Sequence, residues 1–258
     1  MKILFIGDTV ASAGRSILHK HLKPLQETYE VDLTVVNCEN AAGGFGVTPK
    51  IADELFDWGV DVLTSGNHIW DKKEIFPYLD SHSLLLRPAN YPPGNPGRGS
   101  VVAKTGGGEK VAVLNIQGRV FMPSIDDPFR AADAELSALP SDVRVIIVDM
   151  HAEATAEKVA MGWYLDGKVS AVLGTHTHIP TADETILPDG TAYQTDVGMT
   201  GPFHSVIGVM KEDVLRRLLQ QTPVRFKPAS RDARLNGALI DVDSQTGKAR
   251  SIERIQRG

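Results

Sequence analysis

The sequence has a single cysteine, Cys38, so the chain cannot form an intrachain disulfide. It also lacks an apolar run long enough to cross a membrane. The apolar stretch from Met1 to Ile6 meets Gly7-Asp8 too early to form the core of a signal peptide. We therefore expect a protein of the reducing cytoplasm that has no membrane partner.

An excess of basic residues is missing as well. Lys and Arg number 27 against 32 Asp and Glu, the formal net charge is −5, and the two signs are interleaved. Long nucleic acids and anionic membranes are bound by basic surfaces, so neither is an expected partner. A small anionic substrate stays compatible with this charge, because bound metal ions would reverse the local field.

The chain does have ample material for a core. Its 258 residues are 42% hydrophobic, and α/β folds of this length often form one domain. No internal repeat, low-complexity tract or linker divides the sequence. We expect a single domain that spans residues 1–258.

Short β-rich runs alternate with helical stretches along the chain. Buried strands are predicted at 2–6, 32–37, 60–64, 143–148 and 169–173. Helices are predicted at about 12–27 (disturbed at Pro24), 49–58, 71–79, 127–139, 155–165 and 212–220. Hairpins are predicted within 101–116, 185–195 and 239–255. This order indicates an α/β fold of parallel strands with helices outside, extended by antiparallel strands into a second sheet.

Polar side chains follow five of the predicted parallel strands. They are Asp8, Glu39, Asn40, Asn67, His68, His151, His176 and His178. Loops that carry ligands gather at the carboxyl ends of parallel strands, so we expect these side chains to meet. Carboxylates, amides and imidazoles together suit two hard or borderline cations, a common arrangement for hydrolysing phosphate esters.

Each of these residues also has an ordinary alternative when it is taken alone. Asp8 could cap the following helix, and Glu39 could lie in a solvated turn. Asn67 could occupy a left-handed turn position, and a lone His151 could be a satisfied core histidine. The agreement of five strand ends favours the metal site over these separate explanations.

The pair His176 and His178 is the most specific part of this pattern. In extended backbone, residues i and i+2 point to the same side, so both rings would face one point while Thr177 points elsewhere. Histidine pairs also occur on solvated surfaces, and the pair alone therefore leaves both interpretations open.

In combination, these strand ends resemble the calcineurin-like metallophosphoesterase superfamily, and in particular its YmdB-like branch of bacterial cyclic-nucleotide phosphodiesterases. The resemblance covers residues 3 to about 210. It rests on Ile6-Gly7-Asp8, Asn37-Cys38-Glu39-Asn40-Ala41, Ser65-Gly66-Asn67-His68-Ile69-Trp70, Gly174-Thr175-His176-Thr177-His178 and Asp196-Val197-Gly198-Met199-Thr200-Gly201-Pro202. It implies two packed mixed β-sheets flanked by helices in a four-layer sandwich.

The resemblance also implies a role for each site residue. The first metal would be held by Asp8, Asn40 and His178, and the second by Asn67, His151 and His176. Glu39 would bridge both ions, and His68 would act as the general acid that protonates the departing sugar oxygen. Two ions about 3.5–4 Å apart would share a water and lower its pKa, which generates the nucleophile.

Two departures from the superfamily pattern bear on the metals. The usual Asp-x-His block is Asp8-Thr9-Val10 here, which removes one imidazole, and Glu39 replaces the usual bridging Asp. Both departures resemble the YmdB-like branch. A site rich in oxygen and amide ligands favours Mn²⁺ or Fe, whereas its imidazoles also suit Zn²⁺.

The expected function is hydrolysis of small phosphodiesters, with 2′,3′-cyclic nucleotides as substrates and 3′,5′-cyclic nucleotides as further candidates. A phosphomonoesterase or a nuclease that uses the same site is one alternative. A non-catalytic regulator that binds a nucleotide is another. The predicted hairpins leave sheet edges that could support a homo-oligomer.

Overall fold

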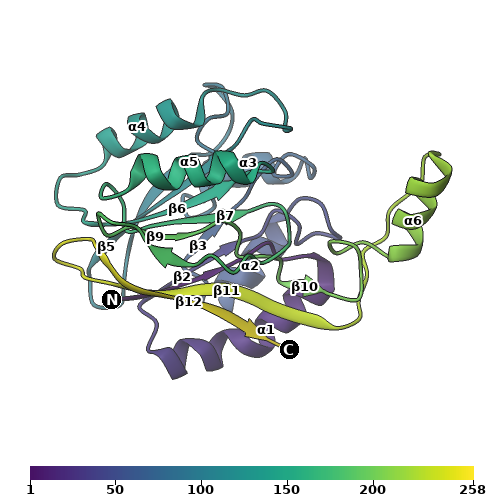
Figure 1. Cartoon of the computed structure of the whole chain (residues 1–258), viewed down its shortest axis with the longest axis horizontal. Helices are drawn as coiled ribbons and strands as arrows, with labels where there is room; N and C mark the ends of the chain where they lie inside the picture. Colours follow the sequence, from purple (N-terminus) through teal and green to yellow (C-terminus); the bar gives the residue numbers. More distant parts are fainter.

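The computed structural model describes all residues, 1–258, and contains two mixed β-sheets packed face to face (Figure 1). The strands of the first sheet are β1 (Lys2–Ile6), β2 (Leu33–Asn37), β3 (Val62–Thr64), β10 (Gly201–Pro202), β11 (Ala233–Val242) and β12 (Ala249–Arg257). Their order is β10-β11-β1-β2-β3, with β12 paired to β11. In this sheet β1, β2 and β3 are parallel, while β11 runs antiparallel to β1.

The second sheet has the order β4-β5-β6-β7-β9-β8. Its strands are β4 (Ser100–Lys104), β5 (Lys110–Gln117), β6 (Val145–His151), β7 (Ala171–Thr175), β8 (Thr185–Ile186) and β9 (Ala192–Gln194). The four central strands are parallel and the two outer ones antiparallel. The α/β fold of two mixed sheets is confirmed, but the parallel strands are divided between both sheets instead of forming one.

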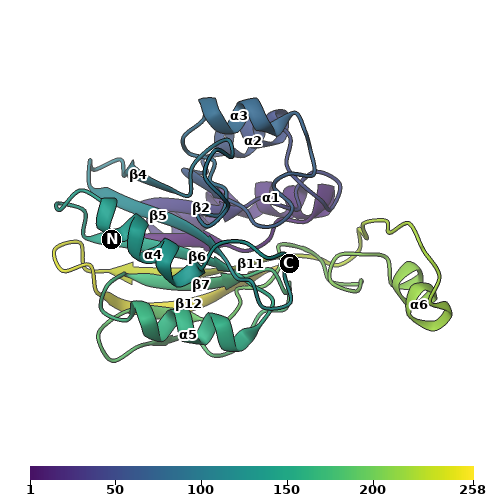
Figure 2. The ribbon, with the colours of Figure 1, turned by 90° about the horizontal axis from the view of Figure 1, so that it is seen from above.

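Helices cover the outer face of each sheet and complete four layers (Figure 2). The first sheet is covered by α1 (Ala11–Tyr29), α2 (Pro49–Asp57) and α3 (Ile75–Ser81), and the second by α4 (Pro128–Ala138) and α5 (Thr155–Leu165). Three apolar clusters fill the spaces between the four layers. The middle cluster joins the inner faces of the two sheets, which fixes one sheet against the other.

The last helix, α6 (Lys211–Gln220), projects away from these layers and has no buried residue (Figures 1 and 2). The chain then returns through residues 221–232 to β11. None of the helices combines the length and the apolar content that a membrane span requires.

Local sequence signals account for several helix boundaries. The Thr48 side chain accepts a hydrogen bond from the backbone N–H of Ile51 at 3.3 Å, and Pro49 begins α2, as predicted. The predicted disturbance at Pro24 is wrong, because α1 continues through it. The helix expected from residue 71 begins only at Ile75, since residues 67–74 form turns at the end of β3.

Candidate metal centre

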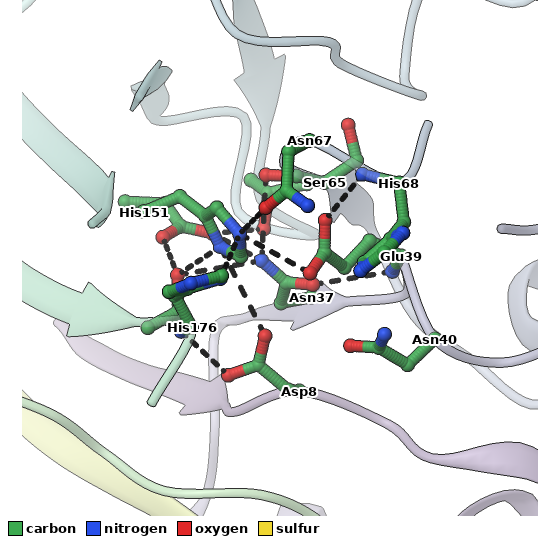
Figure 3. Close-up of polar contacts among 12 residues, drawn as sticks. Asp8, Asn37, Glu39, Asn40, Ser65, Asn67, His68, His151 and His176 are labelled. Atoms are coloured by element: carbon green, nitrogen blue, oxygen red, sulfur yellow. Dashed lines mark hydrogen bonds and ion pairs between the residues drawn. The ribbon is translucent and has the colours of Figure 1, made fainter. Parts of the chain in front are cut away.

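The polar strand ends of both sheets meet at one edge of the sandwich (Figure 3). Asp8 and Glu39 come from the first sheet, and His151 and His176 from the second. The side chains of Asp8, Glu39 and His151 are almost fully buried. The expectation that these side chains lie together is met, although their distance in sequence reaches 168 residues between Asp8 and His176.

The Nε2 atom of His151 lies at the middle of this group. It is 3.1 Å from Oε1 of Glu39, 3.1 Å from Oδ1 of Asn67 and 3.1 Å from Nδ1 of His176. Ligand atoms of Glu39, His151 and His176 all lie within 4.8 Å of one another. A single ring nitrogen can form one directed hydrogen bond, so three such neighbours make an arrangement that a shared cation would satisfy.

Two carboxylate oxygens test whether a metal fits here. Oδ1 of Asp8 and Oε1 of Glu39 are buried and have no hydrogen-bond partner. The nearby His151 nitrogen lies close to Oε1 but outside the direction that a hydrogen bond from the ring requires. Buried carboxylate oxygens without partners are costly, and a bound cation would satisfy both.

The outward-facing ring nitrogens already have partners, which leaves the inward ones free. His178 donates from Nδ1 to the carbonyl of Ile207 at 2.9 Å, and its Nε2 lies 3.3 Å from Oδ1 of Asn40. Nε2 of His176 lies 3.1 Å from a carboxylate oxygen of Glu153. A proton on each outer nitrogen places a lone pair on the inner one, the form that a metal ligand needs.

The pKa values of two histidines report the field at this centre. Burial lowers the pKa of His151, but the charge of Glu39 outweighs it and raises the pKa to about 9. Burial and the neighbouring His151 lower the pKa of His176 to about 3. The surroundings of His151 therefore favour a positive charge at its Nε2, either a proton or a bound cation, while His176 is neutral at physiological pH.

Gly66 permits the close approach of these groups. A Cβ atom at this position would lie 2.1 Å from the His151 ring and 2.5 Å from Oε2 of Glu39. Any other residue would push the end of β3 away from β2 and β6. The glycine before Asn67 is thus a requirement of packing at the centre.

The ordinary alternatives for three residues do not hold. Asp8 does not cap α1; its Oδ2 accepts a hydrogen bond from the backbone N–H of His176 at 3.1 Å. Glu39 is 1% exposed, which excludes a solvated turn. Asn67 does not have the positive φ of a left-handed turn residue.

The expectation that the histidine pair lies in extended backbone is wrong. β7 ends at Thr175, and His176 and His178 have φ values of +96° and +67°. Left-handed backbone at two non-glycine residues is strained and persists only where the surroundings hold it. The two rings reach the centre because a tight turn places them there.

A buried ion pair holds this turn. Oδ2 of Asp196 accepts hydrogen bonds from the backbone N–H and the hydroxyl of Thr177, at 3.1 and 2.7 Å. The same oxygen is 2.6 Å from Nζ of Lys158, and both charged side chains are almost fully buried. The carboxylate thus fixes the residue between the two histidines, and Lys158 neutralises its charge.

Lys158→Met is expected to lower the free energy of unfolding by about 3–5 kcal/mol, because it leaves the Asp196 carboxylate buried without an opposite charge. The double variant Lys158→Met/Asp196→Asn should recover part of that loss. Urea unfolding of both variants measures the two effects. Lys168, an exposed lysine 3.9 Å from Asp133, is the matched control, and Lys168→Met should cost about 1 kcal/mol or less. Equal losses at Lys158 and Lys168 would contradict the role of this ion pair.

A cavity of about 490 Å³ opens directly onto the centre. Its polar wall includes Glu39, Asn40, His68, His176 and His178, and its apolar wall includes Phe45, Ile179, Ile207 and Phe226. This volume suits a ligand the size of a nucleotide. His68 therefore faces ligand space beside the buried group.

His68 differs from its neighbours in its contacts. Its Nδ1 is 2.8 Å from a carboxylate oxygen of Asp71, and the Phe45 ring lies edge-on to it at 5.0 Å. Its backbone N–H donates to Oε2 of Glu39 at 3.0 Å. The His68 side chain is 27% exposed, whereas the side chains of Asp8, Glu39 and His151 are almost fully buried.

Several residues of the site were not identified from the sequence. Glu153 and Ile207 contact histidines from loops that have no motif of their own. Phe226, Lys227 and Pro228 line the cavity from the segment that returns from α6, far along the chain. Among the residues that support the site, only Asp196 lies in a motif noted in the sequence, and no role was assigned to that motif.

Known proteins share this sequence and this fold over nearly the whole length. A family model described as YmdB-like protein matches residues 4–255. A 2′,3′-cyclic-nucleotide 2′-phosphodiesterase from Bacillus subtilis (strain 168) is 50% identical over 255 residues, which cover 99% of this chain and 96% of the relative.

Two solved structures are similar in fold and sequence. A hypothetical protein from Thermus thermophilus has a TM-score of 0.93 and 44% identity, covering 100% of this chain and 99% of the other. A structure described as a novel phosphatase from Mycoplasma pneumoniae has a TM-score of 0.93 and 37% identity, covering 100% and 93%. The resemblance seen in the sequence motifs is confirmed, and the chain belongs to the YmdB-like protein family.

Proposed function

We propose that the chain is a metal-dependent phosphodiesterase that hydrolyses small cyclic nucleotides, with 2′,3′-cyclic monophosphates as its substrates. The observation that carries this proposal is the buried meeting point of Glu39, Asn67, His151 and His176, where two carboxylate oxygens lack partners. The name of the Bacillus subtilis relative supports the same substrate class. The adjoining cavity provides room for the nucleoside.

The proposed ligands divide into two groups that the contacts support. Asn40 and His178 lie together in the first group, to which Asp8 is assigned, and Asn67, His151 and His176 form the second group. Asp8 also borders the second group, because its Oδ2 accepts the backbone N–H of His176 and its Oδ1 is 3.9 Å from Nδ1 of His151. Glu39 adjoins Asn40 in the chain and approaches His151 in space, so it is placed to bridge the two groups. Carboxylate and amide ligands beside the imidazoles favour Mn²⁺ or Fe, and the imidazoles also suit Zn²⁺.

Cations held by these residues would supply a nucleophilic water at neutral pH and would stabilise negative charge on the phosphoryl oxygens. The chain's own residues position the reaction around them. His68 lines the cavity with Asp71 against its Nδ1. When both ring nitrogens carry a proton, Nε2–H gives its proton to the departing sugar oxygen while Nδ1–H stays bound to Asp71. Apolar side chains such as Phe45 and Phe226 provide surface for the base.

Removal and return of metal tests this function. Treatment with a chelator is expected to abolish hydrolysis of 2′,3′-cyclic AMP, and Mn²⁺ is expected to restore it. Separation of 3′-AMP from 2′-AMP shows which ester bond is cut. We expect 3′-AMP, because the Bacillus subtilis relative is named a 2′-phosphodiesterase.

The same assay separates the alternative functions. Faster turnover of p-nitrophenyl phosphate than of bis-p-nitrophenyl phosphate would indicate a phosphomonoesterase. Cleavage of single-stranded oligonucleotides without turnover of the cyclic nucleotide would indicate a nuclease. Tight binding of the cyclic nucleotide by the metal-loaded protein, with no product, would indicate a regulator.

A further inference from the structure

Asp149 is a fully buried carboxylate that the proposed reaction does not use. It lies in β6, two residues before His151, and no lysine or arginine forms an ion pair with it. A carboxylate buried in this way must be compensated by hydrogen-bond donors. The identity of those donors indicates what the side chain does.

Three side chains from both sheets donate to this carboxylate. The Thr175 hydroxyl on β7 donates to Oδ1 at 2.6 Å. The Asn37 side-chain amide on β2 donates to Oδ2 at 3.0 Å, and the Thr64 hydroxyl on β3 donates to the same oxygen. One carboxylate therefore joins strands of the two sheets directly beneath the candidate metal centre.

The first connection from Asp149 leads to His151. A hydroxyl has one proton, and that of Thr175 is directed to Asp149, so its oxygen can only accept from a third group. The atom that faces it is Nδ1 of His151, at 2.9 Å. This contact places the ring proton on Nδ1 and leaves the lone pair on Nε2, which is the atom at the middle of the centre.

The second connection leads to Glu39. Because the Asn37 nitrogen donates to Asp149, its side-chain oxygen turns toward the following residues. That oxygen accepts a hydrogen bond from the backbone N–H of Glu39 at 3.2 Å. The Asn37 amide therefore holds the backbone from which the bridging carboxylate extends.

We propose that Asp149 is a positioning residue for the metal centre: through Thr175 it sets the tautomer of His151, and through Asn37 it orients Glu39. This inference rests on the proposed function, since it takes His151 and Glu39 as metal ligands. The Asp149 carboxylate therefore influences one proposed ligand from each sheet, Glu39 after β2 and His151 in β6.

Asp149→Asn tests the inference with little change in shape. An amide has fewer acceptor sites than a carboxylate, so it cannot accept all three donors. The hydrogen bonds that connect residue 149 through Thr175 to His151 are therefore disturbed. We expect Mn²⁺ to bind the metal-stripped variant about 10–100-fold more weakly, the usual effect of a group that supports a metal ligand. Isothermal titration calorimetry with Mn²⁺ measures this directly, and kcat should fall while KM stays unchanged.

A matched control separates positioning from stability. Glu157 is also a buried carboxylate, but it accepts backbone N–H groups of Arg119 and Val120, outside the centre. Glu157→Gln should leave Mn²⁺ affinity unchanged even where it lowers the thermal midpoint. An affinity loss of equal size in Asp149→Asn and Glu157→Gln would overturn the inference.

A second pair of variants keeps the inference testable should Asp149→Asn fail to fold. Thr175→Ser retains the hydroxyl between Asp149 and His151, whereas Thr175→Val removes it. The serine variant should keep wild-type Mn²⁺ affinity and the valine variant should lose it; equal affinities would overturn the connection. A wild-type chain that binds no Mn²⁺, Fe²⁺ or Zn²⁺ would overturn the proposed function itself, a result distinct from either of these.

Discussion

Asp8→Ala is expected to reduce kcat/KM for the cyclic nucleotide by more than about 10³-fold, since loss of a single preorganised electrostatic group already costs about 10²–10³. Oδ1 of Asp8 is one of the two buried carboxylate oxygens at this centre that have no hydrogen-bond partner, and it is a proposed ligand. Removal of this side chain would weaken one of the two proposed metal positions. Bound metal per chain, measured by elemental analysis, should fall together with activity.

The same variant should keep its fold. In the metal-free protein the buried Asp8 carboxylate is a cost rather than a benefit, because burial opposes its charge and raises its pKa. The urea midpoint of metal-free Asp8→Ala should therefore not lie below that of the metal-free wild type. Asp57, an exposed aspartate on α2, is the matched control, and Asp57→Ala should change neither metal content nor rate. Near wild-type turnover by Asp8→Ala would exclude the proposed metal site.

His68→Ala is expected to lower the rate of cyclic nucleotide hydrolysis by about 10²–10⁴, the usual contribution of a general acid. Its side chain is outside the buried ligand group and faces the cavity, so metal content should be unchanged. A sugar alkoxide is a poor leaving group and depends on protonation. The loss should therefore be much smaller with bis-p-nitrophenyl phosphate, whose nitrophenolate departs without a proton.

Comparison of the two substrates decides the role of His68. Equal losses on both would show that it positions the substrate or the metal instead of donating a proton. A lower metal content would place it among the ligands. His82, an exposed histidine stacked on Tyr78, is the control, and His82→Ala should retain full activity on either substrate.

Much of the fold could be predicted because its signals are local. Apolar runs with β-rich composition mark β1, β2 and β6, and the Thr48-Pro49 pair marks the start of α2. The division of the parallel strands between two sheets could not be predicted this way. Which strands pair depends on contacts between residues far apart in sequence, and no local pattern encodes them.

The same distinction between local sequence signals and long-range contacts applies to the candidate site. By itself, the sequence determined which side chains follow the parallel strands. Because the carboxyl ends of such strands meet at one edge, it also indicated that Asp8, Asn67 and His151 would lie together. It also determined the family, because the motifs are specific in combination.

Only the tertiary structure decided how these groups are held. The left-handed turn of His176 and His178 depends on Asp196 and Lys158, which reach it from other elements. The orientation of His151 depends on Asp149, whose donors come from both sheets. The role of a buried charge is inferred from its hydrogen-bond and ion-pair partners. Those partners are distant in sequence, and only tertiary packing places them beside the charge.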